Sequence, residues 1–159
     1  MNLFEHQGKR LYQDFSIPTP KSFFVSSTSE ISDSHGLIYP VVVKAQVQVG
    51  GRGKAGGIKV AKDFDELIKF SDEILGMDIK SHIVESLLLE EASNILEEYY
   101  ISFTLDRSAK SYLMMLSAKG GMDIEEVAEN NPDDLIMLHI SPSKGLDSET
   151  IFKSIEDAK

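Results

Sequence analysis

The sequence of 159 residues contains no cysteine. This absence excludes a disulfide framework and a thiolate metal site, and it is compatible with a reducing compartment. Basic residues are also scarce, since 16 Lys and Arg stand against 26 Asp and Glu and the formal net charge is −10. This balance argues against a general binding surface for nucleic acids or membranes.

Long apolar runs and targeting signals are absent as well. No apolar stretch reaches the roughly eighteen residues that a membrane-spanning helix needs. The first ten residues lack an apolar core and include Glu5, so they predict neither a secretory signal nor an arginine-rich transit peptide. The four histidines, His6, His35, His82 and His139, share no metal-ligand spacing. None of them is assigned a catalytic role.

The length of 159 residues fits one domain or two small lobes, and a hydrophobic fraction of 42% is ordinary for a globular protein. Apolar spacing predicts helices over residues 3–15, 27–36, 63–75, 123–129 and 148–158, and strands over 22–25, 39–43, 58–61, 82–89, 97–106, 111–117 and 134–140. The last helix is expected to turn Ile151, Phe152 and Ile155 inward. Because hairpins are mixed with helices, the pattern favours an α+β fold with antiparallel sheets.

A glycine-rich loop is the strongest local signal. Five glycines fall within the eight positions from Gly50 to Gly57. Such a segment lets backbone N–H groups approach an anion closely, and concave nests of this kind bind phosphate. Arg52 and Lys54 add charged donors. The loop lies between two predicted strands and lacks the order of a P-loop. A glycine-rich hairpin turn is the alternative, although tight turns rarely need so many glycines.

Two further features could contact the same ligand. Lys44 ends an apolar strand, where it either reaches an anion in a cleft or lies exposed at the strand end. The strand that runs into Glu90 could present its backbone to an adenine edge, and Glu98 could accept hydrogen bonds from ribose hydroxyls. For this acidic stretch, a solvated loop is the alternative that spacing alone favours. The pair Gly120-Gly121 is explained by a turn and a helix start.

Several segments resemble the β subunits of succinyl-CoA synthetases, over nearly the whole chain: residues 1–9, 42–47, 50–60, 90–92, 106–108 and 120–129. The string from Gly50 to Gly57 is the most specific of them. The resemblance implies an ATP-grasp fold, in which ATP lies between two α+β lobes under a glycine-rich flap. The chain is far shorter than a family β subunit, so the fold is expected to be truncated. Residues 21–92 would form the flap lobe, and residues 1–20 with 93–159 an incomplete second lobe.

The resemblance also implies which residues contact ATP or ADP. They are Lys44, Gly51, Arg52, Gly53, Glu90, Ser93 and Glu98. Family members that prefer GTP have Gln where this chain has Pro20, which favours ATP. The magnesium ligands of the family, an Asn and an Asp, are expected beyond Lys159, so no metal ligand and no catalytic residue is assigned within the chain. The segment between Gly76 and Leu89 is shorter than in some members, which should alter only a surface loop.

The implied reaction converts succinate, CoA and ATP to succinyl-CoA, ADP and phosphate through a phosphohistidine on an α subunit, as in the citric acid cycle. The expected partner is that α subunit, in a heterodimer or heterotetramer, and this chain alone is expected to be inactive. Cytoplasm, or the mitochondrial matrix after processing, is the expected location. Two alternatives stay open, a stand-alone nucleotide-binding module without catalysis and the β subunit of a malate–CoA ligase.

Overall fold

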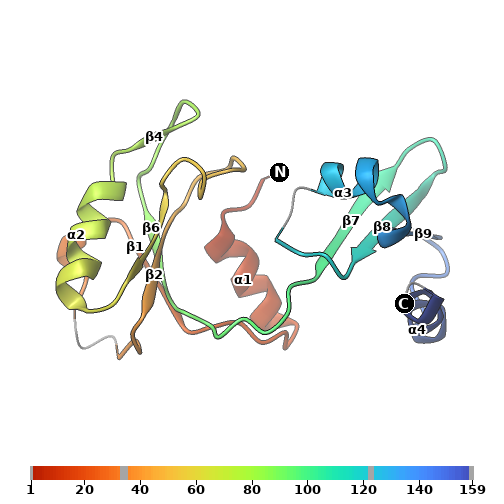
Figure 1. The fold of residues 1–159 in the computed structure, drawn as a ribbon, viewed down its shortest axis with the longest axis horizontal. Coiled ribbons are helices and arrows are strands. Elements are labelled where there is room, and N and C mark those ends of the chain that lie inside the picture. The colour runs from red at the N-terminus through yellow and green to blue at the C-terminus, as the bar shows by residue number, and fades with distance from the viewer. Residues whose placement is uncertain (1, 33–35, 122–123, 158–159) are drawn as a thin grey trace. The chain divides into compact units, whose positions relative to one another are not determined.

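A computed structural model of the chain describes residues 2–32, 36–121 and 124–157. The chain forms two compact units, Met1–Asn94 and Ile95–Lys159, each with its own antiparallel sheets (Figure 1). The α+β class with antiparallel pairing is therefore confirmed. The structure groups residues 1–20 with the first unit, because helix α1 (Glu5–Asp14) contacts the sheet of that unit. The division into a flap lobe of 21–92 and a second lobe of 1–20 plus 93–159 stays a prediction.

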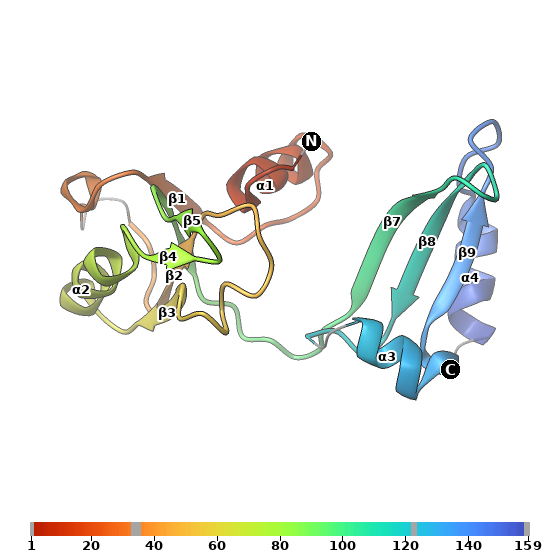
Figure 2. The same cartoon turned by 90° about the horizontal axis from the view of Figure 1, so that it is seen from above.

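The first unit is built on a four-stranded sheet in the order β1-β6-β2-β3. Its elements after α1 are β1 (Ser22–Val25), the 3-10 turn η1 (Thr28–Glu30), β2 (Val41–Ala45), β3 (Ile58–Ala61), helix α2 (Phe64–Ile74), the small hairpin β4 (Asp78–Ile79) and β5 (His82–Ile83), and β6 (Leu87–Glu91). All neighbouring strands of the sheet run antiparallel. In Figures 1 and 2 this sheet lies between α2 and α1.

The two faces of this sheet differ in chemistry, because successive side chains of a strand point to opposite faces. On β2, Val41, Val43 and Ala45 are fully buried and belong to the core that α2 covers. The intervening Lys44 points to the other face. Residues paired across antiparallel strands share a face, and the pairing of Val42 with Glu90 places that carboxylate beside Lys44. One face therefore holds the apolar core, and the opposite face carries charges.

Helix α2 agrees with its sequence signals. The side chain of Asp63 accepts a hydrogen bond of 2.9 Å from the backbone N–H of Glu66, as an N-cap should. Gly76, expected to end the helix, follows it with φ of +81°. Leu67 and Ile74 turn inward to the core. Local signals at both ends were thus sufficient to predict this helix.

Two predicted elements of the first unit are wrong. The strand expected over residues 82–89 is split into β5 and β6, because Val84 exchanges backbone hydrogen bonds with Gly76 and Met77 and so leaves the main sheet. The helix expected over residues 27–36 shrinks to the turn η1, although Ser27 caps it by accepting from the N–H of Ser29. The part of that prediction on residues 33–35 lies outside the described residues.

The second unit contains a three-stranded antiparallel sheet in the order β7-β8-β9. Its elements are β7 (Tyr100–Asp106), β8 (Ser111–Ser117), helix α3 (Ile124–Asn130), the 3-10 turn η3 (Pro132–Asp134), β9 (Ile136–Ile140) and helix α4 (Ser148–Asp157). The predicted hairpin is confirmed, with Tyr100 paired to Ser117 and Asp106 to Ser111. The strand and helix bounds agree with the sequence prediction to within a few residues.

The inward side of α4 is narrower than expected. Ile151 and Ile155, one turn apart, are half-buried, whereas Phe152 is 67% exposed. The prediction that Phe152 turns inward is wrong, and the inward face of α4 holds Ile151 and Ile155, which lie four residues apart. Over the described part of the chain, no helix is both long enough and apolar enough to cross a membrane.

Candidate functional site

The glycine-rich loop connects β2 to β3 and is folded on itself by three backbone hydrogen bonds. The N–H groups of Ala55, Gly56 and Gly57 donate to the carbonyls of Gly51, Gly53 and Arg52 at 3.1, 3.0 and 2.8 Å. Gly51 and Gly56 have φ of +79° and +83°, in the left-handed region that favours glycine. Part of the glycine content is therefore explained by the turn itself, which is the alternative that the sequence left open.

Gly57 and Gly50 differ in how closely other atoms surround them. A Cβ on Gly57 would lie 2.6 Å from Cδ1 of Ile79 and 3.1 Å from both Cβ of Ala45 and the carbonyl oxygen of Arg52. A Cβ on Gly50 would meet no atom within 4 Å. Packing requires Gly57, whereas nothing in the described fold requires Gly50. An open glycine position is what the close approach of a ligand would need.

Five charged side chains gather on the sheet face opposite the apolar core. Lys44 Nζ lies 2.6 Å from Oε1 of Glu90 and 3.2 Å from Oε1 of Glu5. Lys9 lies 3.5 Å from Glu5 and also forms an ion pair with Glu90. Arg52 forms an ion pair with the other carboxylate oxygen of Glu5. We name these residues, Glu5, Lys9, Lys44, Arg52 and Glu90, the charge cluster.

The charge cluster combines two cations from the strand and loop region with contacts from helix α1. Arg52 folds back onto the end of β2, where Nη1 donates 3.0 Å to the carbonyl oxygen of Ala45. The guanidinium therefore lies beside the strand that carries Lys44, and both cations reach Glu5. The structure thus brings Arg52 of the loop and Lys44 of the strand to one anion, as a phosphate site would require.

Because the charge cluster is partly buried, each of its charges needs a partner of opposite sign. The side chain of Glu90 is 6% exposed, and a buried carboxylate is stable only when it is paired. Burial raises the pKa of Glu5, but the charges of Arg52 and Lys44 outweigh that effect and hold the pKa below its ordinary value. Burial and the neighbouring charge of Lys44 lower the pKa of Lys9. Three cations face two carboxylates, so the cluster carries one unbalanced positive charge.

The remaining predicted contacts do not join this cluster. Gly51 and Gly53 lie in the loop beside Arg52, Ser93 is exposed after the end of β6, and Glu98 belongs to the second unit. The backbone carbonyl of Glu98 accepts a 3.0 Å hydrogen bond from Gly120. A Cβ on Gly120 would lie 2.6 Å from the carbonyl carbon of Glu98, so close packing explains this glycine in addition to the predicted turn.

Sequence reasoning missed Glu5 and Lys9 as members of the site. Both lie on α1, four residues apart, on one face of the helix. That spacing of opposite charges was visible in the sequence and predicts a helix face able to meet other charges. No signal in the sequence indicated that this face covers Lys44, which lies 39 residues from Glu5.

A small hollow of about 280 Å³ adjoins the charge cluster beneath α1. It is lined by His6, Lys9, Arg10, Gln13, Ser22, Phe24 and Leu88. The ring of His6 lies 4.3 Å from that of Phe24, and its Nδ1 lies 3.1 Å from Oε1 of Gln46. On this side, the charge cluster borders a hollow whose lining includes the basic side chains of Lys9 and Arg10.

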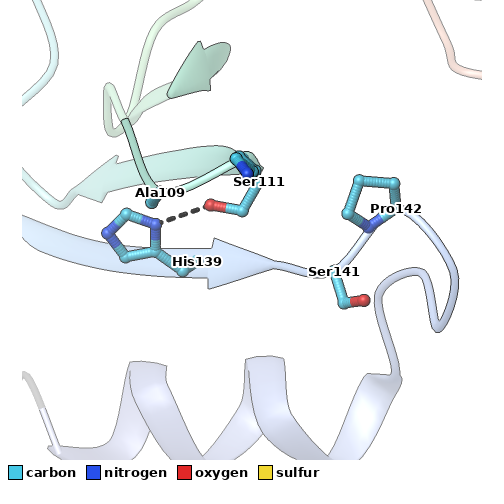
Figure 3. A pocket seen from close by; sticks show the side chains of 6 residues that line it. Ala109, Ser111, His139, Ser141 and Pro142 are labelled. Carbon is cyan, nitrogen blue, oxygen red and sulfur yellow. Dashed lines mark hydrogen bonds between the residues drawn. The ribbon is translucent and has the colours of Figure 1, made fainter. Parts of the chain in front are cut away.

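A second hollow of about 370 Å³ lies at the hairpin end of the other unit (Figure 3). There Oγ of Ser111 lies 2.8 Å from Nδ1 of His139. The carboxylate of Asp106 approaches the same ring nitrogen at 3.9 Å. A Ser–His–Asp relay needs the serine and the carboxylate on different ring nitrogens, so this arrangement does not form one. Among the described residues, no group of three His, Asp or Glu could hold a metal ion.

Comparison with known proteins shows one family over the whole chain. Residues 2–159 match the family model described as the ATP-grasp domain. The β subunit of the ADP-forming succinate–CoA ligase of Halobacterium salinarum is 45% identical over 159 residues, and that of Halorubrum lacusprofundi is 43% identical. Each alignment covers 99% of this chain and 42% of the relative. The chain therefore spans less than half the length of these relatives.

Solved structures agree on the fold. A dinucleotide forming acetyl-coenzyme A synthetase of Ca. Korarchaeum cryptofilum, in complex with coenzyme A and Ca-AMPCP, matches with a TM-score of 0.77 at 22% identity. The match covers 98% of this chain and 66% of that one. The ATP citrate lyase of Methanothrix soehngenii matches with a TM-score of 0.67 at 19% identity, over 99% of this chain and 42% of that one. At these identities the likeness shows a shared fold.

Proposed function

Because this chain belongs to the ATP-grasp domain family, we propose that it is the nucleotide-binding part of the β subunit of an ADP-forming succinate–CoA ligase. The observation that carries the proposal is the convergence of Lys44 and Arg52 on a single anion, the carboxylate of Glu5. A phosphate of ATP or ADP offers the same negative charge with more acceptor oxygens. The family and the high identity to two such β subunits support the choice of ligase.

A separate role is proposed for each predicted contact. Lys44 and Arg52 would neutralise the phosphates, while the backbone N–H groups at Gly51 and Gly53 would approach them from the loop. The end of β6 after Glu90, with Ser93, would present its backbone to the adenine edge. Glu98, in the second unit, would accept hydrogen bonds from the ribose. These residues bind and orient the nucleotide, and none of them is proposed to form a bond with substrate.

The complete reaction is proposed for the larger assembly. Succinate, CoA and ATP would give succinyl-CoA, ADP and phosphate, with the phosphoryl group passing through a histidine of the α subunit. The chain spans 42% of the length of the β subunits it matches, so the magnesium ligands and the acid-binding part are proposed to lie in the remaining length. Magnesium bound there would neutralise phosphate charge. Pro20 favours ATP over GTP, and this chain alone is proposed to be inactive.

Titration of the 159-residue chain with Mg·ATP by isothermal calorimetry tests nucleotide binding. The substitution Lys44→Met keeps the apolar stem and removes the charge, so affinity should fall about tenfold or more, since hydrogen bonds to charged groups contribute about 1.5–3 kcal/mol. Lys62→Met removes a charge from an exposed position just after β3 and should leave affinity unchanged. A wild-type chain that binds no Mg·ATP, or two variants that bind alike, would contradict the proposal.

The two alternatives differ in what the assembled protein does. ADP release that depends on succinate, CoA and a co-purified α subunit supports the succinate–CoA ligase. The same release with malate in place of succinate supports a malate–CoA ligase. Tight binding of Mg·ATP without association with any α subunit supports a stand-alone module.

A further inference from the structure

Helix α1 lies on the charged face of the first sheet without a buried residue of its own. Its contacts to the sheet and the neighbouring loop are mostly polar. The backbone N–H of His6 donates 3.1 Å to Oε1 of Gln46, and the ring of His6 packs on Phe24. The ion pairs of Glu5 and Lys9 supply the rest. Leu11 and Phe15 are exposed, so apolar burial contributes little to the position of the helix.

The carboxylate of Glu5 is contacted by cations on both oxygens. Lys44 lies 3.2 Å and Lys9 3.5 Å from Oε1, while Arg52 pairs with Oε2. Lys44 and Arg52 are the same two side chains proposed to bind the nucleotide phosphates. An isolated helix of ten residues is marginal in water, so α1 depends on these contacts for its stability.

The two carboxylates of the charge cluster differ in how easily a ligand could displace them. Glu90 belongs to the central strand β6, paired with β1 and β2, and its side chain is 6% exposed. Glu5 belongs to a helix held at the surface of the sheet, and its side chain is 19% exposed. An incoming phosphate that pairs with Lys44 and Arg52 would therefore replace Glu5 and leave Glu90 in place.

We propose that Glu5 occupies the phosphate position of the nucleotide site, and that a bound phosphate displaces this carboxylate and loosens α1 from the sheet. The inference rests on the proposed function, since it concerns the same two cations. Glu5 acts as an internal competitor that keeps Lys44 and Arg52 paired while the site is empty. Its cost is a weaker apparent affinity, because the ligand must break these ion pairs before it binds.

The substitution Glu5→Gln tests the competition, because it keeps the size of the side chain and removes its charge. Calorimetric titrations with Mg·ATP and with inorganic pyrophosphate would compare the wild-type chain, Glu5→Gln and Asp14→Asn. The control removes one negative charge from an exposed position on the same helix. Glu5→Gln should bind both probes about tenfold tighter, equivalent to about 1.4 kcal/mol, whereas Asp14→Asn should stay within about twofold of wild type.

Hydrogen exchange of the wild-type chain gives a second readout that needs no variant. Amides of residues 5–14 should exchange faster when pyrophosphate is bound, because α1 has lost its contact with Lys44 and Arg52. Binding by wild type with unchanged or slower exchange of α1 would overturn the inference. Equal or weaker binding by Glu5→Gln would also overturn it, although the proposed function would stand. If neither protein binds either probe, the inference and the proposed function both fail.

Discussion

Gly57 offers a sharp test of how the loop is held. It ends the glycine-rich segment, and its carbonyl accepts a 2.7 Å hydrogen bond from the N–H of Ala45 on β2. In Gly57→Ala, the added Cβ would lie 2.6 Å from Cδ1 of Ile79, which is fully buried. It would also lie 3.1 Å from the backbone carbonyl oxygen of Arg52. The side chain of Ile79 can turn only by disturbing the core, and the backbone must shift as well.

The expected cost follows from overpacking. Extra methyl or methylene groups in a well-packed region destabilise proteins by about 1–3 kcal/mol. With an m-value of about 1–3 kcal/mol per molar urea, the unfolding midpoint of the first unit should fall by roughly 0.3–3 M. The shift should also move Arg52, because the backbone of Arg52 receives both the clash and the hydrogen bond from Gly57.

Urea unfolding followed by far-UV circular dichroism measures this loss. Gly50→Ala is the matched control, since it places the same methyl group seven residues earlier in the same segment, where no atom lies within 4 Å. The control should change the free energy of unfolding by less than about 0.5 kcal/mol. Equal midpoints for the two variants would refute the assignment of Gly57 as a packing position.

Two more outcomes are expected. Gly120→Ala should destabilise the second unit by about 1–3 kcal/mol in the same assay. The added Cβ would lie 2.6 Å from the backbone carbonyl carbon of Glu98 and 2.7 Å from the backbone N of Tyr99. An unchanged unfolding midpoint would contradict this prediction. Docking of α1 should weaken in acid. Since the pKa of Glu5 is lowered in the folded chain, its contribution to docking is complete above about pH 4.5, the ordinary pKa, and is lost as the pH falls through the lower pKa of the folded chain. Nuclear magnetic resonance of the amides of residues 5–14 would show the change, and Glu5→Gln should abolish it.

Elements with signals inside their own sequence were predictable. Strand β8 is an apolar run between two serines, helix α2 has a helical apolar pattern, and Asp63 and Gly76 mark the ends of α2. The single strand expected over residues 82–89 failed because Val84 bonds to the backbone just after α2 and leaves the main sheet. The N–H of Val84 donates to the carbonyl of Met77, and its carbonyl accepts from the N–H of Gly76, both at 2.9 Å. No local pattern around Val84 indicates these bonds.

The candidate site also contains residues that were predictable from the sequence and one that was not. Lys44 and Arg52 were predictable as anion contacts, because a lysine on an apolar strand and an arginine within a glycine-rich loop are unusual on structural grounds alone. The carboxylate that pairs with both cations was not predictable. Glu5 lies 39 residues from Lys44 and 47 from Arg52, and only the folded sheet brings them together.

The charge on the sheet face also explains why a phosphate could loosen the helix that covers it. A face that carries Lys44 and Glu90 cannot be covered by an apolar helix, because the helix would bury both charges without further partners. Helix α1 meets them with Glu5 and Lys9 at a spacing of four residues, which pairs opposite charges across the contact. Contacts of this kind are exchanged more readily than apolar burial, since another anion can supply the same charge. The complementarity that lets α1 cover the site is therefore what allows a phosphate to compete with it.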